Sequence, residues 1–282
     1  SLVGLGSIPA EKRNPLELET RGIGELILQL VDQGVKTICV GIGGSATNDG
    51  GIGMAAGLGV AFYDDQDHLL RPVGASLGRV ARIDTSAVPN ALQDIDLQVL
   101  TDVTNPLCGS QGATYVFGGQ KGLNPLLFPA VDQAMKDFYQ LVDARILSMA
   151  GAGAGGGMAA GLVAFAGGKI SSGIEKSLDL IDFDRKVQKA DLVVVGEGRM
   201  DLQSLSGKAP VGVAKRTPEK IPVIAICGSL SEDLPTFPSQ NIDAAFSIVP
   251  GPCEVADALA HAERNLISCA RNIGNLLKMN AN

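Results

Sequence analysis

The densest group of chemically active residues lies in the glycine-rich stretch 41–51. This stretch combines glycines with hydroxyl, amide and carboxylate side chains: Gly43, Gly44, Ser45, Asn48 and Asp49. An apolar run precedes it and a small-residue helical pattern follows it, which predicts a strand, a glycine loop and a helix. Such a loop presents backbone N–H groups to an anion. We therefore expect Gly43, Gly44 and Ser45 to cradle a phosphate or a carboxylate, the alternative being a tight structural turn.

A second polar group follows the predicted strand at 191–195. Its members are spaced along one segment and end at the start of a helix: Glu197, Arg199, Asp201 and Lys208. The two cations can hold carboxylate or phosphate oxygens, and the two carboxylates can hold Mg²⁺ or orient a hydroxyl group. A salt-bridged loop is the structural alternative. A binding site is favoured because open α/β sheets bind ligands at the ends of their strands.

Asp102 and Asn105 occupy the same kind of place, directly after the predicted strand at 96–100. On local grounds Asp102 serves equally well as a ligand or as a turn residue. The two histidines lie in a predicted turn and a predicted helix, away from the glycine loops, and no Ser-His-Asp or Cys-His arrangement is evident. Glycine loops, basic residues and carboxylates without histidine suit phosphoryl transfer, which depends mainly on positioning and charge neutralisation.

Two nucleotide-binding fingerprints match the sequence only in part. Residues 41–46 fit G-x-G-x-x-A, and Asp64 lies about 20 residues further on, as in dinucleotide-binding proteins. The glycines at 50–51 count against this match, because a helix should already be running there and each glycine would cost it about 1 kcal/mol. The Gly-Lys pair at 207–208 is not a P-loop, since alanine follows where serine or threonine is required.

The composition is that of a folded protein with a sizeable core. Of the 282 residues, 45% are hydrophobic and 19% are charged. The net charge of −7 argues against a general affinity for nucleic acid or anionic membranes. Five scattered cysteines without CxxC spacing suit reduced thiols in a cytoplasmic protein. No apolar run reaches the about 20 residues of a membrane span.

The order of the predicted elements indicates an α/β fold. Helices are expected at 22–33, 53–58, 125–148, 210–216 and 255–277. Strands are expected at 36–40, 60–63, 96–100, 191–195, 221–227 and 244–249. A second glycine loop at 151–161 opens onto an apolar helix. The last three strands each run into a polar or glycine loop, which predicts parallel pairing and a site at their carboxyl ends, although three strands are few for a doubly wound sheet.

Six longer motifs occur in a fixed order: GIGGSATNDGG (41–51), DVTNPLCG (102–109), GAGAGGGMAAGL (151–162), SGIE (172–175), GEGRMDLQSLSGKAPVGVA (196–214) and FSIVPGP (246–252). Together they resemble the type I glycerate kinases over essentially the whole chain. The resemblance implies an enzyme that phosphorylates D-glycerate with ATP and Mg²⁺. It further implies that the 2-hydroxyl group is the acceptor, which gives 2-phosphoglycerate.

The family fold that the resemblance implies has two α/β domains with the active site between them. On this sequence, an inserted α/β domain corresponds to residues 1–187 and the C-terminal part of a Rossmann-like domain to residues 188–282. Family members carry a further N-terminal segment, with D-S-x-K-like and A-D-G-G-E-G-T motifs that are not found in this sequence. We therefore expect a glycerate kinase without that segment, which would explain the small number of strands.

The resemblance also suggests roles for the residues named above. Asn48 and Asp49 are expected to orient the glycerate hydroxyl group or a metal ion. Arg199 and Lys208 are expected to neutralise anionic oxygens, and Asp201 or Asp49 to accept the hydroxyl proton. Two alternatives stay open: an NAD-dependent oxidoreductase that uses the fingerprint at 41–46, and a fragment that binds glycerate or nucleotide without turnover. The partners are small molecules, and a homo-oligomer is left open.

Overall fold

The computed structural model describes residues 4–202, 204–206 and 208–279. The chain divides into two compact units, unit 1 at Ser1–Gly173 and unit 2 at Ile174–Asn282. This division falls before the predicted domain boundary at 187, because helices α6 (Gly173–Leu180) and α7 (Phe183–Val187) group with unit 2. Arg216 of unit 2 holds these helices through ion pairs with three carboxylates: Glu175, Asp179 and Asp184.

Unit 1 is built on a three-stranded parallel sheet of order β1-β4-β5, with a separate antiparallel β2-β3 ribbon. The strands are β1 (Thr37–Gly41), β2 (Ala61–Tyr63), β3 (Arg82–Asp84), β4 (Asp96–Leu100) and β5 (Lys169–Ser171). The helices are α1 (Arg21–Asp32), α2 (Ile52–Gly57), α3 (Ala113–Phe117), α4 (Phe128–Val142) and α5 (Ala154–Ala166). Short 3-10 helices lie at Leu5–Ser7, Ala10–Lys12, Gly74–Arg79, Asn90–Asp94, Gly119–Lys121, Pro125–Leu127 and Ala144–Ser148.

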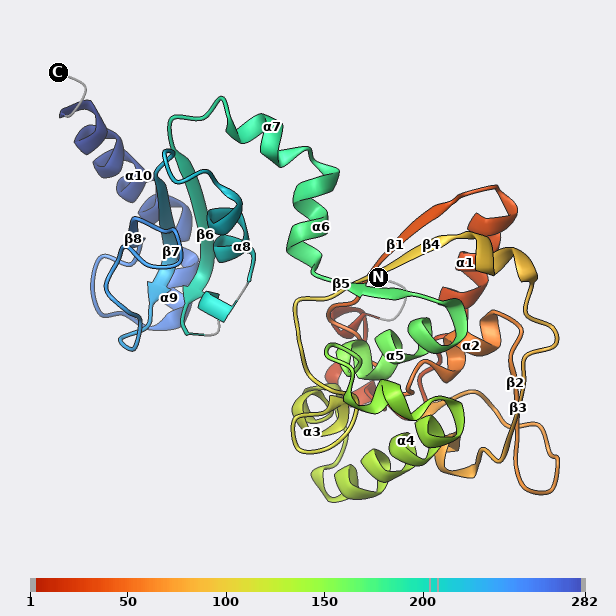
Figure 1. Cartoon of the computed structure of the whole chain (residues 1–282). Coiled ribbons are helices and arrows are strands. Elements are labelled where there is room, and N and C mark those ends of the chain that lie inside the picture. The colour runs from red at the N-terminus through yellow and green to blue at the C-terminus, as the bar shows by residue number, and fades with distance from the viewer. Residues whose placement is uncertain (1–3, 203, 207, 280–282) are drawn as a thin grey trace. The chain divides into compact units, whose positions relative to one another are not determined.

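Two hydrophobic clusters hold unit 1 together. In the first, helices α1, α2 and α5 pack against one face of the β1-β4-β5 sheet, where Ile38, Leu97 and Val99 are buried (Figure 1). The second cluster joins the β2-β3 ribbon to α4, and the ring centroids of Phe62 and Phe138 lie 5.8 Å apart. Helix α2 contributes to both clusters, so the glycine loop that precedes it is anchored on both sides.

Helices α1 and α2 meet backbone to backbone. A Cβ atom added to Gly24 of α1 would lie 2.1 Å from the carbonyl oxygen of Met54, and one added to Gly57 of α2 would lie 2.2 Å from the carbonyl oxygen of Arg21. Only glycine allows so close an approach at these two positions. The contact fixes the first turn of α1 against α2.

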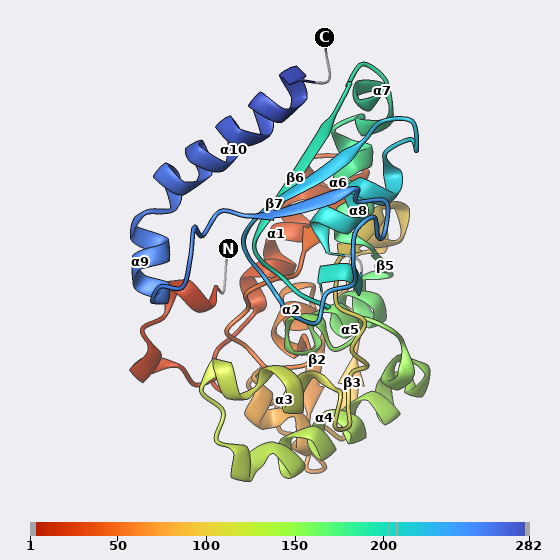
Figure 2. The same cartoon turned by 90° about the vertical axis from the view of Figure 1, so that its left-hand side faces the viewer.

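Unit 2 contains the predicted parallel sheet, with strand order β6-β7-β8. The strands are β6 (Val193–Met200), β7 (Val223–Leu230) and β8 (Ala244–Ser247). The other elements are a 3-10 helix (Ser204–Ser206) and helices α8 (Ala209–Arg216), α9 (Val255–Ala260) and α10 (Ala262–Met279). Helix α8 lies on one side of this sheet and α10 on the other in both views (Figures 1 and 2). The prediction of parallel pairing in this part of the chain is confirmed.

Some predicted elements are wrong in extent. Residues 196–200 were expected in a loop, but β6 continues to Met200 because β7 runs beside it and pairs Ser229 with Arg199. The helix expected at 125–148 is divided, since Asp143 takes an extended conformation (φ −165°) and its carboxylate accepts a hydrogen bond from the N–H group of Arg145. The helix expected at 255–277 breaks at His261 into α9 and α10.

Other helices and strands were not predicted at all: β3, α3, β5, α6 and α7. Each is short, and β5 has three residues, too few to show a periodicity. Within the described ranges, no helix combines the length and the apolar character that a bilayer crossing needs.

Candidate functional site

The glycine loop is held from within by Asp49, a fully buried carboxylate. Thr20 Oγ1 donates to its Oδ2 at 2.6 Å, and the N–H groups of Gly51 and Gly53 donate to its two oxygens at 3.1 and 3.3 Å. Gly51 is the N-cap residue of α2 and Gly53 lies in its first turn, so Asp49 accepts hydrogen bonds from backbone donors at the start of this helix. Burial raises the pKa of Asp49, and the hydrogen bonds oppose that shift. The carboxylate therefore faces protein donors and shapes the loop.

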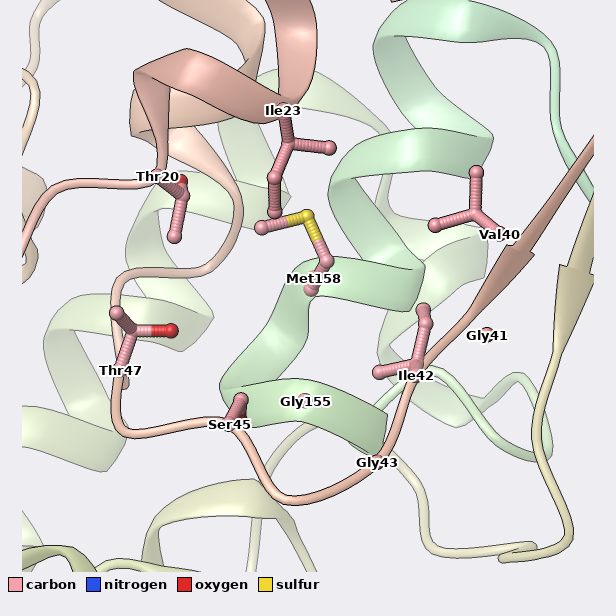
Figure 3. A pocket seen from close by; sticks show the side chains of 10 residues that line it. All are labelled: Thr20, Ile23, Val40, Gly41, Ile42, Gly43, Ser45, Thr47, Gly155 and Met158. Carbon is pink, nitrogen blue, oxygen red and sulfur yellow. The ribbon is translucent and has the colours of Figure 1, made fainter. Parts of the chain in front are cut away.

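Next to Asp49, two buried side chains each leave a polar atom without a partner. Asn48 Nδ2 donates to Thr114 Oγ1 at 3.0 Å, but Asn48 Oδ1 and Thr47 Oγ1 have no hydrogen-bond partner among the described residues. Buried polar atoms are nearly always satisfied in folded proteins. Figure 3 shows the Thr47 hydroxyl directed into a space between Ser45 and Met158. We therefore expect a ligand or water at this place.

A cavity of about 90 Å³ adjoins the loop. Its lining comes from β1, the loop and the starts of α1 and α5: Thr20, Ile23, Val40, Gly41, Ile42, Gly43, Ser45, Thr47, Gly155 and Met158 (Figure 3). Gly43 and Gly44 are exposed, and a Cβ atom on either would meet nothing within 4 Å, so a ligand can approach their backbone. The volume suits a small molecule or group and is too small for a nucleotide.

The structure adds a residue that the sequence did not point to, Lys121. Its side chain is buried, and its Nζ donates to Ser45 Oγ at 3.0 Å and to the carbonyl oxygen of Thr47 at 2.7 Å. Burial lowers the pKa of Lys121 to about 8, while the charge of Asp49 acts in the opposite direction. The only local signal is a lysine between glycines in GGQKG (118–122), outside any amphipathic pattern and away from a strand end.

The second glycine stretch overlaps the start of α5, but its backbone is not helical at Gly155, Gly156 and Gly157, so it forms a kink that opens onto the apolar helix, in keeping with the predicted glycine loop. Gly155, Gly156 and Gly157 have φ values of +67°, +74° and +88°, which other residues rarely adopt. The N–H group of Gly50 donates to the carbonyl oxygen of Gly156 at 3.0 Å. A Cβ atom on Gly156 would lie 2.1 Å from the carbonyl oxygen of Thr47. The start of α5 is thus packed directly against the first glycine loop.

Tyr139 of α4 anchors the glycine loop, and a substitution at this residue tests that role. Its hydroxyl donates to the carbonyl oxygen of Gly50 at 2.7 Å, and the residue is fully buried. Tyr139→Phe leaves this buried carbonyl without its donor, and we expect a loss of about 1–3 kcal/mol in the free energy of unfolding, measured by urea denaturation. The control is Tyr115→Phe, because Tyr115 is 39% exposed. Equal losses in the two variants would contradict the anchoring role.

Asp102 and Asn105 follow β4, at the sheet edge from which the glycine loop also leaves, since Gly41 pairs with Leu100. Asp102 Oδ1 accepts a hydrogen bond from the N–H group of Gly173 at 2.9 Å, and Asn105 Nδ2 donates to the carbonyl oxygen of Gln111 at 2.8 Å. Both side chains therefore hold backbone segments, and a binding role for either stays a prediction.

In unit 2, Glu197 and Arg199 project from β6 beside a cavity of about 900 Å³. This cavity lies at the carboxyl ends of β6, β7 and β8 and has largely aliphatic walls, and its volume is in the range of nucleotide-sized ligands. Glu197 Oε1 is buried without a hydrogen-bond partner among the described residues. Burial raises the pKa of the neighbouring Cys227 thiol, against a backbone hydrogen bond at Glu197 that lowers it, and the charge of Glu197 raises it further. Arg199 is exposed.

Asp201 and Lys208 lie together just after β6. The N–H group and the hydroxyl of Ser204 donate to Asp201 Oδ1 at 2.9 and 3.2 Å, and Lys208 Nζ lies 3.8 Å from the same oxygen. Lys208 is also the residue before α8. The structure thus keeps the four predicted residues of this group in one region of unit 2, with Glu197 and Arg199 on the strand and Asp201 and Lys208 beyond it.

The predicted metal ligands can be compared with what a metal ion requires. Across the part of the chain that the structure describes, no three His, Cys, Asp or Glu side chains gather into a metal site. The partnerless oxygen of Glu197 fits Mg²⁺ better than Asp201 does, because Asp201 Oδ1 already accepts from Ser204. Mg²⁺ is commonly held by one or two carboxylates together with water and substrate phosphates, so a single carboxylate is sufficient.

Parallel sheets, a glycine loop with exposed backbone and a large cavity at strand ends are typical of α/β enzymes that bind small molecules. The chain belongs to the glycerate kinase family, whose family model matches residues 1–278. It is therefore an enzyme, a kinase, and the predicted resemblance and the α/β fold class are confirmed. None of the relatives below is named an oxidoreductase, so they give the NAD-dependent alternative no support.

The chain is similar to several glycerate kinases along nearly its whole length. It is 57% identical over 278 residues to a glycerate kinase of Neisseria meningitidis serogroup B, a match that covers 99% of this chain and 75% of that protein. It is 40% identical over 275 residues to the glycerate 2-kinase of Escherichia coli, covering 96% and 72% of the two chains. A solved structure named for glycerate kinase 2 from Salmonella typhimurium LT2 matches with a TM-score of 0.80 and 40% identity, covering 99% of this chain and 74% of that one.

Proposed function

We propose that this kinase transfers the terminal phosphoryl group of ATP to the 2-hydroxyl group of D-glycerate, with Mg²⁺ accompanying the nucleotide. The observation that carries the proposal is the glycine loop of unit 1, where the exposed backbone of Gly43 and Gly44 adjoins the Ser45 hydroxyl. Phosphoryl transfer depends on positioning and on neutralisation of charge, and this loop offers both. Membership of the family supplies the substrate class.

The two cavities differ tenfold in volume, which suggests how the substrates are divided. We assign the glycerate carboxylate to the cavity of about 90 Å³ beside the loop and the nucleotide to the cavity of about 900 Å³ in unit 2. Asn48 Oδ1 is an acceptor without a partner in the described part of the chain, so it suits a glycerate hydroxyl group as donor. Asp49 supports this arrangement by holding the loop and is not assigned a proton-transfer role, since its carboxylate already accepts three hydrogen bonds.

In unit 2, each polar side chain has a role that its surroundings support. Arg199 and Lys208 neutralise phosphate oxygens, and Glu197 holds Mg²⁺. Bound Mg²⁺ supplies neutralisation of the phosphate charge. Asp201 accepts the proton of the glycerate hydroxyl group as general base. Its Oδ1 is oriented by the N–H group of Ser204 at 2.9 Å, which fixes the carboxylate after the strand end.

The experiment that tests the proposed function combines a rate with a product assignment. The purified chain is incubated with Mg-ATP and D-glycerate, and release of ADP is followed with a coupled assay. Phosphorus NMR then identifies the product, because a phosphate on the 2-position couples to one proton and one on the 3-position couples to two. We expect glycerate-dependent release of ADP and a doublet. A triplet would overturn the assignment of the 2-hydroxyl group, and binding without turnover would favour the non-catalytic alternative.

A further inference from the structure

Lys121 places a positive charge inside unit 1, beneath the exposed part of the glycine loop. The residue is 3% exposed, and the two oxygens near its Nζ, Ser45 Oγ and Thr47 O, are neutral acceptors. No carboxylate of a described residue forms an ion pair with it, although Asp49 acts on it from a greater distance. A buried charge without an opposite charge in contact is costly. A bound anion would compensate for that cost.

Ser45 connects the buried charge to the surface of the loop. Since Nζ donates to Ser45 Oγ at 3.0 Å, the hydrogen of the Ser45 hydroxyl must point elsewhere. Ser45 is half-buried and directly follows the exposed Gly43 and Gly44. A hydroxyl group that accepts a charge-assisted hydrogen bond becomes polarised and donates more strongly. An anionic oxygen on the loop would therefore receive a hydrogen bond strengthened by the ammonium group.

The backbone contact of Lys121 leads to a second sign of a ligand. Its Nζ also donates to the carbonyl oxygen of Thr47, and the side chain of this residue carries the buried hydroxyl that has no partner among the described residues. That hydroxyl is directed into the cavity that Ser45 also lines (Figure 3). One lysine thus fixes both hydroxyl-bearing residues at the same cavity.

We propose that Lys121 is the positioning residue of the glycine loop, which orients the Ser45 hydroxyl and supplies the charge that selects an anionic group, a carboxylate or a phosphate, in the adjoining cavity. Lys121 acts through Ser45 and does not touch the reacting atoms. The identity of the anion rests on the proposed function, which assigns the glycerate carboxylate here. The selection of an anion by Lys121 does not depend on phosphoryl transfer and is tested by binding alone.

Titration of Lys121 gives a signature that a purely structural lysine would lack. Its pKa lies at about 8, and Asp49 is the charged group that faces it. The ammonium form therefore predominates below pH 8 and is lost as the pH rises through that value. If the anion binds only the ammonium form, its dissociation constant rises about tenfold between pH 7 and pH 9.

The test is isothermal titration calorimetry of the whole chain with D-glycerate and, separately, with ATP. At pH 7 we expect Lys121→Met to raise the dissociation constant of one of these two ligands by about tenfold or more and to leave that of the other unchanged. The ligand that is affected shows whether a carboxylate or a phosphate occupies the cavity. Lys121→Arg, which keeps the charge, should retain most of the affinity. Lys136→Met is the matched control, because it removes the same charge from an exposed position on α4.

A second variant separates the charge from the fold. If the charge acts through Ser45, it should matter little once the Ser45 hydroxyl is gone. Adding Lys121→Met to a Ser45→Ala variant should therefore raise the dissociation constant of the anion by less than about threefold. The proposal is overturned if Lys121→Met binds both anions as the wild type does, or if the wild-type dissociation constants do not change from pH 7 to pH 9. The pH series remains decisive even if Lys121→Met fails to fold. Charge-dependent binding of glycerate without phosphoryl transfer would contradict the proposed function alone.

Discussion

Gly156→Ala is expected to lower the free energy of unfolding of unit 1 by about 3 kcal/mol or more and to remove anion binding by the loop. The added Cβ atom would lie 2.1 Å from the carbonyl oxygen of Thr47, and the backbone has φ +74°. The left-handed conformation alone costs a non-glycine residue about 1–2 kcal/mol, and overpacking adds about 1–3 kcal/mol. Urea denaturation followed by circular dichroism measures the loss, and calorimetry with D-glycerate measures the binding.

The matched control for this variant lies at the other end of the same helix. Gly167 also has a left-handed backbone, with φ +65°, but a Cβ atom there would meet nothing within 4 Å. Gly167→Ala should therefore lose only the conformational part, about 1–2 kcal/mol, and keep its affinity for the anion. If both alanine variants lost the same stability and both kept binding, the packing of α5 against the loop would not matter for the site.

Asp201→Asn is expected to lower kcat about 10²–10⁴-fold with little change in stability. The amide oxygen of asparagine can still accept from the N–H group of Ser204, which lies 2.9 Å from Asp201 Oδ1, so the geometry after β6 is retained. The amide cannot take up the proton of the substrate hydroxyl group. The measurement is the steady-state release of ADP with D-glycerate and Mg-ATP, together with a thermal melt of each protein.

The variant Asp49→Asn distinguishes the structural role of Asp49 from the general-base role of Asp201. Asp49 accepts from Thr20 Oγ1 and from the N–H groups of Gly51 and Gly53, so an amide nitrogen in place of one oxygen would face a donor. We therefore expect a loss of stability, with any loss of activity following the fraction that remains folded. Near-normal turnover in Asp201→Asn, with a folded but inactive Asp49→Asn, would show that the base has been assigned to the wrong residue.

The strand, glycine loop and helix around residues 37–59 could be predicted because their signals are local. The apolar run became β1 and the small residues became α2, close to the expected limits. The polar segment at 196–200 misled for the opposite reason. Its glycines and charges are typical of a loop, but β7 provides a hydrogen-bonding partner as far as Leu230, and Leu230 pairs with Met200. Strand β7 lies more than 20 residues further along the chain, so the local sequence around 196–200 does not reveal this pairing.

The candidate site was predictable at the loop and not at the residues that support it. Gly43, Ser45 and Asn48 carry chemical types that suggest binding wherever they occur in a glycine loop. Lys121 bonds Ser45 across 76 residues, and Thr114 bonds Asn48 across 66. Such contacts depend on how distant elements pack in the folded protein, and the sequence pattern alone does not predict that packing.

The glycine contact between α1 and α2 has a consequence for the entropy of binding. Thr20, which bonds Asp49, directly precedes α1, and the close approach of Gly24 and Gly57 holds this end of α1 against α2 without intervening side chains. No rotamers have to be ordered there when a ligand arrives. This support of Asp49 is therefore in place once the chain has folded, and ordering it would take little of the interaction energy of a bound ligand.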